Sequence, residues 1–580
     1  MIKLFKYLRP YLWMLVILTG LTYLQVAANL ALPDYMAKIV NQGIVGQDTN
    51  AIYSNGWLML LVTLGGGICA LGAGYFASVI GTGFAKKLRD LVFSKVETFS
   101  LVEFNKFSTA SLITRTTNDV QQVQMVMVML LRIALMAPFM GIIAVFKAYD
   151  LAPSMTWIMA VAISGLVSII IVLFIVAMPS FTKLQKLVDK INLVTREILT
   201  GLRVIRAFDK ESYEEQKFQR ANRDLTKVNL FVNRLMVFLQ PVMMLIMNLT
   251  TILIVWVGAH KIETGFLDIG NMLAFLQYAT MAIMAFLMLS IIFIMVPRAS
   301  VSGDRIEEVL DTKVKIRDPK NPVEVSRDGG KVEFENVTFA YAGSEEPVLR
   351  DISFTAFPGQ TTAFVGSTGS GKSTLINLIP RFYDVTSGKI LVDGVNVRDM
   401  RQEDLRAKIG YVSQRIMLFS GTVKDNISYG RPGASFDEIK NAADTAQATE
   451  FIEQLDKKFE NSIAQAGGNI SGGQKQRLSI ARALAKKPEI YIFDDSFSSL
   501  DFKTDAALRN ALKKETAGKT VLIVAQRIST IMQADKILVL DAGKIVGQGT
   551  HQELLKSCEV YRQIAMSQLS KKELAGDTKN

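Results

Sequence analysis

The stretch TTAFVGSTGSGKST, at residues 361–374, decides the fold of the second half of this chain. Residues 361–365 are small or apolar and predict a buried strand, and residues 375–382 predict a helix. A glycine-rich loop in this strand–loop–helix context is typical of phosphate binding, because its backbone N–H groups and the helix N-terminus attract phosphate oxygens. The loop consists of Gly366, Ser367, Thr368, Gly369, Ser370, Gly371, Lys372, Ser373 and Thr374. We expect Lys372 to contact the β- and γ-phosphates of a nucleotide and Ser373 to ligate Mg²⁺.

Two further segments downstream carry phosphate chemistry. Residues 490–494 (IYIFD) form an apolar strand pattern that ends in Asp494, a carboxylate suited to the Mg²⁺ side of such a site. Residues 469–474 (NISGGQ) form a second glycine-rich turn directly before a helical run at 475–484, which predicts a second anion site. Because one phosphate loop suffices for one triphosphate, we expect the second turn to serve the nucleotide of another molecule.

The first half of the chain has a different character. The protein has 580 residues, of which 50% are hydrophobic and 20% charged, with a mean hydropathy of +0.27. This composition predicts a membrane-embedded part. Apolar runs of about 20 residues, enough to cross a bilayer, occur at 12–32, 57–81, 126–146, 155–178, 235–258 and 272–297. We therefore predict an all-α six-span transmembrane domain at 1–310, a linker at 311–330, an α/β phosphate-loop domain at 331–570 and a polar tail at 571–580.

The charges are distributed unevenly. Sixty-five Lys and Arg against 53 Asp and Glu give a net charge of +12, which by itself is compatible with nucleic-acid binding. However, the basic residues crowd the connections after spans 2 and 4, and the connections after spans 1, 3 and 5 are nearly free of them. By the positive-inside rule both termini are cytoplasmic, in a multi-pass protein of the cell (plasma or inner) membrane, and no nucleic-acid partner is expected. Both basic connections keep a helical period, so we predict that spans 2–5 continue as helices into the cytosol rather than as flexible loops.

In their order, these motifs resemble an ATP-binding cassette (ABC) exporter half, in which six spans are fused to one nucleotide-binding domain. The resemblance implies that two cassettes enclose two ATP molecules head to tail. It places Tyr341 against adenine and makes Gln414 the sensor of Mg²⁺ and γ-phosphate, so that Ser373, Gln414 and Asp494 would hold Mg²⁺ through ATP. Without the family, Tyr341 reads as a strand-end aromatic residue and Gln414 as a surface amide.

The same resemblance assigns further segments. The signature that would contact the partner's ATP consists of Ser471, Gly472, Gly473 and Gln474. Residues 498–501 match the loop that crosses between cassettes, and residues 104–120 and 197–208 match the cytoplasmic loops that transmit cassette motion to the spans.

At the catalytic edge, two residues depart from the family pattern. Asp495 stands where a glutamate normally polarises the attacking water, and it is shorter by one methylene, about 1.5 Å. Gln526 stands where a histidine normally contacts the γ-phosphate, and glutamine cannot carry a proton. We expect a site that binds ATP and hydrolyses it poorly. The alternative is that both are tolerated variants in a working site.

This pattern resembles the degenerate-site subunit of heterodimeric multidrug exporters, and it implies a second, non-identical half-transporter as partner. Methionines on spans 5 and 6 suit a cavity for small lipophilic compounds such as drugs, lipids or peptides, or else ordinary helix packing. They are Met243, Met244, Met247, Met272, Met281, Met284, Met288 and Met295. Two other functions stay open, a homodimeric lipid flippase and an ATP-binding regulatory subunit that does not itself translocate.

Overall fold

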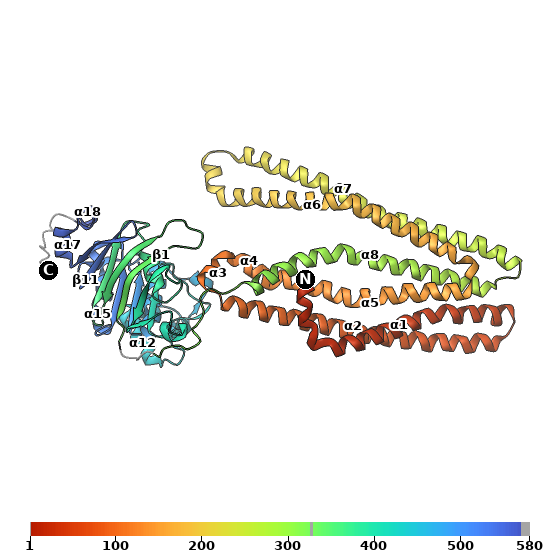
Figure 1. Ribbon diagram of the computed structural model, residues 1–580, viewed down its shortest axis with the longest axis horizontal. Coiled ribbons are helices and arrows are strands. Elements are labelled where there is room, and N and C mark those ends of the chain that lie inside the picture. Colours follow the sequence, from red (N-terminus) through yellow and green to blue (C-terminus); the bar gives the residue numbers. More distant parts are fainter. Residues whose placement is uncertain (1, 325–328, 570–580) are drawn as a thin grey trace. The chain divides into compact units, whose positions relative to one another are not determined.

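The computed structural model describes residues 2–324 and 329–569 (Figure 1). The predicted polar tail at 571–580 and part of the predicted linker lie outside these residues. The chain divides into two compact units. The helical unit comprises Met1–Glu97 and Ser108–Thr312, and the α/β unit comprises Thr98–Phe107 and Lys313–Asn580.

The helical unit is built from long helices joined by short turns. Its principal elements are η1 (Ile2–Tyr11), α1 (Leu12–Lys38), η2 (Ile39–Val45), α2 (Thr49–Glu97), α4 (Thr109–Thr114), η3 (Arg115–Asp119), α5 (Val120–Leu151), η4 (Pro153–Met155), α6 (Thr156–Ala207), α7 (Glu211–Glu263) and α8 (Ile269–Asp311). Within the described residues, six helices are long and apolar enough to cross a membrane, which confirms the six predicted spans. At 1.5 Å per residue, the 49 to 53 residues of α2, α6 and α7 exceed the ~30 Å of a bilayer core by more than half. The predicted helical continuation is therefore confirmed for spans 2, 4 and 5.

The long helices pack in pairs, α1 with α2, α5 with α8, and α6 with α7. Small residues let α5 and α8 approach closely: a Cβ added at Gly141 on α5 would lie 3.4 Å from the Cβ of Ala285 on α8. Figure 1 shows the α6–α7 hairpin, in yellow, running apart from α5 and α8 along much of its length. The turn of this hairpin exposes Phe208, which is 71% accessible.

The α/β unit contains three sheets. Its strands are β1 (Val332–Phe339), β2 (Leu349–Ala356), β3 (Thr361–Gly366), β4 (Ser387–Val392), β5 (Val395–Asn396), β6 (Ile409–Val412), β7 (Gly421–Thr422), β8 (Ser462–Ile463), β9 (Ile490–Asp494), β10 (Thr520–Val524), β11 (Lys536–Asp541) and β12 (Lys544–Gly549). The main sheet has the order β12-β11-β3-β10-β9-β6, and all its pairs are parallel except β11 with β12. A four-stranded antiparallel sheet, β2-β1-β4-β5, packs on it through one shared apolar core.

The α/β unit also contains helices, most of them short. They are α3 (Leu101–Lys106), α9 (Lys372–Leu378), α10 (Gln402–Ala407), α11 (Val423–Ser428), α12 (Phe436–Thr445), α13 (Thr449–Glu453), α14 (Gly472–Ala485), α15 (Phe502–Glu515), α16 (Ile528–Ile531), α17 (His551–Ser557) and α18 (Glu559–Gln568). The helix predicted at 375–382 is observed as α9 and ends earlier than expected. Pro380 explains the difference, because proline disfavours a helical conformation at the residue before it.

The short helix α3 belongs to the α/β unit although it lies in the first half of the sequence. Ser100 and Glu103 form a reciprocal capping box at its N-terminus, and Glu103 is 4% accessible. The other carboxylate oxygen of Glu103 accepts a hydrogen bond from the backbone N–H of Lys315 at 3.2 Å. One carboxylate thus both caps α3 and joins it to the segment that enters the α/β unit.

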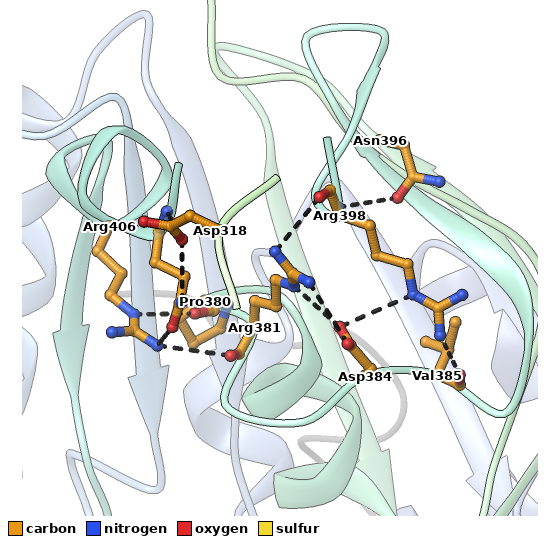
Figure 2. A network of polar contacts seen from close by, with 9 residues as sticks. Asp318, Pro380, Arg381, Asp384, Val385, Asn396, Arg398 and Arg406 are labelled. Atoms are coloured by element: carbon orange, nitrogen blue, oxygen red, sulfur yellow. Dashed lines mark hydrogen bonds and ion pairs between the residues drawn. The ribbon is translucent and has the colours of Figure 1, made fainter. Parts of the chain in front are cut away.

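A polar network holds that entering segment to the chain that follows α9 (Figure 2). Asp384 accepts a hydrogen bond from the guanidinium group of Arg381 at 2.9 Å and forms an ion pair with Arg398 at 3.7 Å. Asp318 accepts from both the backbone and the side-chain amide of Gln402, at 3.1 and 2.9 Å. Arg381 has a left-handed backbone (φ 54°) and is only 5% accessible. Because its guanidinium group is paired with Asp384, the cost of burying its charge is offset.

Candidate nucleotide site

The candidate site lies along the carboxyl edge of four neighbouring parallel strands, β3, β10, β9 and β6. The phosphate loop follows β3, Gln526 follows β10, Asp494 and Asp495 come at the end of β9, and Gln414 follows β6. The carboxyl ends of parallel strands meet at one edge, which is where open α/β sheets bind ligands. The topology therefore gathers residues from positions 366 to 526 at one place.

The phosphate loop has the backbone that its glycines allow. Gly371 precedes α9 with φ 99°, and a Cβ there would lie 2.7 Å from a methyl group of Leu349. A Cβ at Gly366 would lie 2.1 Å from the carbonyl oxygen of Leu540. Lys372 Nζ donates to the carbonyl oxygens of Gly366, at 2.8 Å, and Ser367, at 2.7 Å. Burial lowers the pKa of Lys372. The loop thus forms a narrow cradle with a cation at its end, and it fits the phosphates of a nucleotide.

Ser373 and Asp494 form the metal side of this cradle. The Ser373 hydroxyl donates to Asp494 Oδ1 at 3.1 Å, and Asp494 is 4% accessible. Burial raises the pKa of Asp494, and the hydrogen bond from Ser373 opposes that shift. A hydroxyl and a carboxylate are oxygen ligands of the kind Mg²⁺ prefers, so these two residues fit the predicted role of holding Mg²⁺ with ATP, which supplies the remaining charge.

The side chain of Asp495 is held by two amides. Gln526 Nε2 donates to Asp495 Oδ2 at 3.0 Å, and Gln414 Nε2 donates to the same oxygen at 3.5 Å. Asp495 has φ 48°, and its backbone N–H donates to the carbonyl oxygen of Val524 on β10. Burial raises the pKa of Asp495, while the hydrogen bond from Gln414 lowers it. Asp495 Oδ2 therefore accepts hydrogen bonds from side chains that follow both neighbouring strands, β6 and β10.

Tyr341 lies beside Thr374, the last residue of the phosphate loop, in an aromatic cluster. Its hydroxyl is 2.9 Å from the hydroxyl of Thr374, the last loop residue. Its ring packs edge to face with Phe339 and Tyr383. The Tyr383 hydroxyl in turn accepts from the side-chain amide of Asn105 on α3 at 3.4 Å. Sequence reasoning missed Tyr383 and Asn105, which join α3 to the nucleotide loop through Tyr341. The adenine contact of Tyr341 stays a prediction.

The signature turn forms the N-terminus of α14. Ser471 Oγ accepts from the N–H of Gln474 at 3.3 Å, and Gln474 Oε1 accepts from the N–H of Ser471 at 2.9 Å. The first N–H groups of the helix, those of Gly472 and Gly473, have no hydrogen-bond partner within the helix. Gly473 also approaches the crossing loop, since a Cβ there would lie 3.3 Å from the carbonyl oxygen of Ser499. The turn and the crossing loop therefore form one surface.

Comparison with known proteins agrees with this geometry. Residues 15–286 match the family model of the ABC transporter transmembrane region, and residues 349–498 match that of the ABC transporter. An ABC transporter ATP-binding protein of Mycobacterium tuberculosis is 42% identical over 97% of both chains. The chain belongs to the ABC transporter family. An ATP-dependent lipid A-core flippase of Syntrophus aciditrophicus is 35% identical over 86% of this chain and 82% of its own.

The fold is that of an exporter half-transporter. The solved structure of a bacterial Atm1-family ABC exporter with ATP bound covers 97% of this chain and 99% of its own, with a TM-score of 0.82 and 25% identity. This confirms the predicted fold class, six apolar helices followed by an ABC nucleotide-binding domain. The protein is a multi-pass membrane transporter whose domain type binds and hydrolyses ATP.

Four of the eight methionines singled out on spans 5 and 6 take part in helix packing. Met272, Met281 and Met288 pack against the apolar core that α1, α5 and α8 share, and Met243 is buried in a second apolar core. Met244 and Met284 are exposed, at 58% and 39%. For these four of the eight methionines the structure favours ordinary packing over a substrate cavity.

Proposed function

We propose that this chain is the degenerate-site subunit of a heterodimeric ABC exporter. The observation that carries the proposal is the contact of Gln526 with Asp495: these two residues, which both depart from the family pattern at the catalytic edge, are hydrogen-bonded to each other at 3.0 Å. A general base has to come within about 2.6–3.2 Å of the proton that it accepts. Asp495 is short by one methylene, and its Oδ2 atom is already engaged by two amides.

The groups gathered at the phosphate loop support nucleotide binding in this proposal. Lys372, Ser373 and the loop N–H groups would hold the phosphates, Asp494 would hold Mg²⁺ beside Ser373, and Gln526 and Asp495 would lie where water attacks. In this account the chain binds Mg²⁺ATP at its own loop and turns it over slowly. Its signature, Ser471–Gln474, completes a competent site on a different half-transporter.

The substrate that we propose is a lipophilic compound of lipid type, moved outward across the cell membrane with both termini in the cytoplasm. Support comes from the relative that is named a lipid A-core flippase and from the distribution of basic residues.

The purified chain tests the proposal directly. It should bind Mg²⁺ATP, because the phosphate loop is intact. Its steady-state ATPase activity should be near background, because the Asp495 carboxylate already accepts hydrogen bonds from Gln414 and Gln526. Rapid ATP hydrolysis by a verified homodimer, abolished by Lys372→Ala, would contradict the proposal and favour the homodimeric flippase. Addition of the partner chain should restore ATPase and vectorial lipid transport. Restored ATPase without transport would favour a regulatory subunit.

A further inference from the structure

The last residue of α18, Gln568, contacts the segment that carries Gln526. Its Nε2 donates to the carbonyl oxygen of Gln526 at 2.8 Å, and its Oε1 accepts from the N–H of Ile528 at 2.8 Å. Ile528 is the first residue of α16, whose N-terminus has no side-chain cap from its own N-cap residue, Arg527. A single amide from another helix therefore bonds to the backbone on both sides of Arg527.

Gln568 is one of several contacts that hold this segment. Arg527 donates to the carbonyl oxygen of Ser498 in the crossing loop at 3.2 Å. The helix α18 is itself fixed: Tyr561 and Ala565 are fully buried in a core with residues of β3 and α16. Gln568 thus connects a rigid helix to the backbone of Gln526.

The position of the Gln526 side chain matters for the nucleotide. Its amide donates to Asp495, and the preceding residue, Asp494, accepts a hydrogen bond from Ser373, which directly follows Lys372. The loop lysine is the group that contacts the β- and γ-phosphates. The Gln526 amide therefore lies at the end of the site where ATP carries a phosphate that ADP lacks.

We propose that Gln568 is a positioning residue of the nucleotide site, which holds Gln526 at the γ-phosphate end and thereby favours ATP over ADP. The inference rests on nucleotide binding at this loop, which is part of the proposed function. It assigns a role at the nucleotide site to the C-terminal helix, which none of the nucleotide-binding motifs includes.

The test uses the full-length chain in lipid nanodiscs with mant-ATP and mant-ADP as probes. Gln568→Ala should weaken mant-ATP binding about three- to tenfold, the effect of one poorly placed hydrogen bond. Its effect on mant-ADP should stay within about twofold. Gln563→Ala is the matched control, because Gln563 lies on the same helix and its amide donates to Glu559. It should change neither affinity.

Two further variants separate positioning from a structural role. In a Gln526→Ala background, Gln568→Ala should have no further effect on mant-ATP, because the side chain that it positions is gone. Gln568→Glu keeps the acceptor for Ile528 and loses the donor to Gln526, so its mant-ATP affinity should be intermediate, and it carries the test where the alanine variant does not fold.

The outcomes are distinct. Equal weakening of both nucleotides, unchanged mant-ATP binding, or a full effect in the Gln526→Ala background would overturn the inference while leaving the proposed function intact. A wild-type chain that binds neither nucleotide would overturn both.

Discussion

Restoring the two departing residues should enable hydrolysis at this chain's own site. The change is Asp495→Glu together with Gln526→His. In the native protein the Asp495 carboxylate accepts from Gln526 at 3.0 Å and from Gln414 at 3.5 Å. The longer glutamate would extend the carboxylate by about 1.5 Å. The histidine would replace one of the two amides that now engage it.

The expected magnitude follows from the role of a general base. Correct positioning of such a base typically contributes about 10²–10⁴-fold to the rate. Because Asp495 and Gln526 contact each other, the two changes should not be additive, and Asp495→Glu alone should recover only part of the gain. Turnover of the whole complex should rise far less, since conformational steps limit many transport cycles.

The assay needs a complex whose other site is silent. Replacing the glutamate of the partner's site leaves the site on this chain as the source of residual ATPase. The matched control is Asp495→Gln with Gln526→His, which has the length of glutamate but no base. A rise of at least tenfold in the first variant, absent in the control, is expected. Equal rates in both, with ATP binding and assembly intact, would refute the reasoning.

Three other outcomes follow from the structure. Ser471→Ala should reduce ATPase of the complete complex more than Asp495→Asn, because the signature serves the competent site; equal losses in a steady-state assay would contradict the asymmetry. Gly371→Ala should weaken ATP binding about five- to thirtyfold, since an L-residue at φ 99° costs about 1–2 kcal/mol, and unchanged affinity by fluorescence titration would count against the observed loop. Lys408→Met should destabilise the protein by about 3–5 kcal/mol, because it strips a buried cation from Asp393 and Glu489, 2.9 and 2.5 Å away; a melting temperature equal to that of the wild type would exclude this.

Much of the architecture could be predicted from local sequence. Span-length apolar runs gave the six membrane helices, and a glycine-rich loop between a strand and a helix gave the phosphate site. These features depend on composition and spacing within a few turns of chain, so they are visible without tertiary structure. The N-terminus of α3 could also be predicted, because Ser100 and Glu103 have the spacing of a capping box.

The contacts that define the site could not be predicted in the same way. The hydrogen bond between Gln526 and Asp495 depends on β10 lying beside β9, and the contact of Gln568 with the Gln526 backbone depends on how α18 packs. Likewise, the Tyr341 hydroxyl lies against Thr374 because β1 and α9 share one core. Each of these pairs joins residues 31 to 42 positions apart through the topology of the fold, which no local pattern encodes.

The most direct test of the central claim is the state of the nucleotide on this chain during turnover. The complete complex would be supplied with photoreactive 8-azido-ATP, labelled at either the α- or the γ-phosphate, and crosslinked while it hydrolyses. The account predicts that this chain retains both labels, because its site holds intact ATP, while the partner chain retains the α-label and loses the γ-label. Loss of the γ-label from this chain as fast as from its partner would contradict the account.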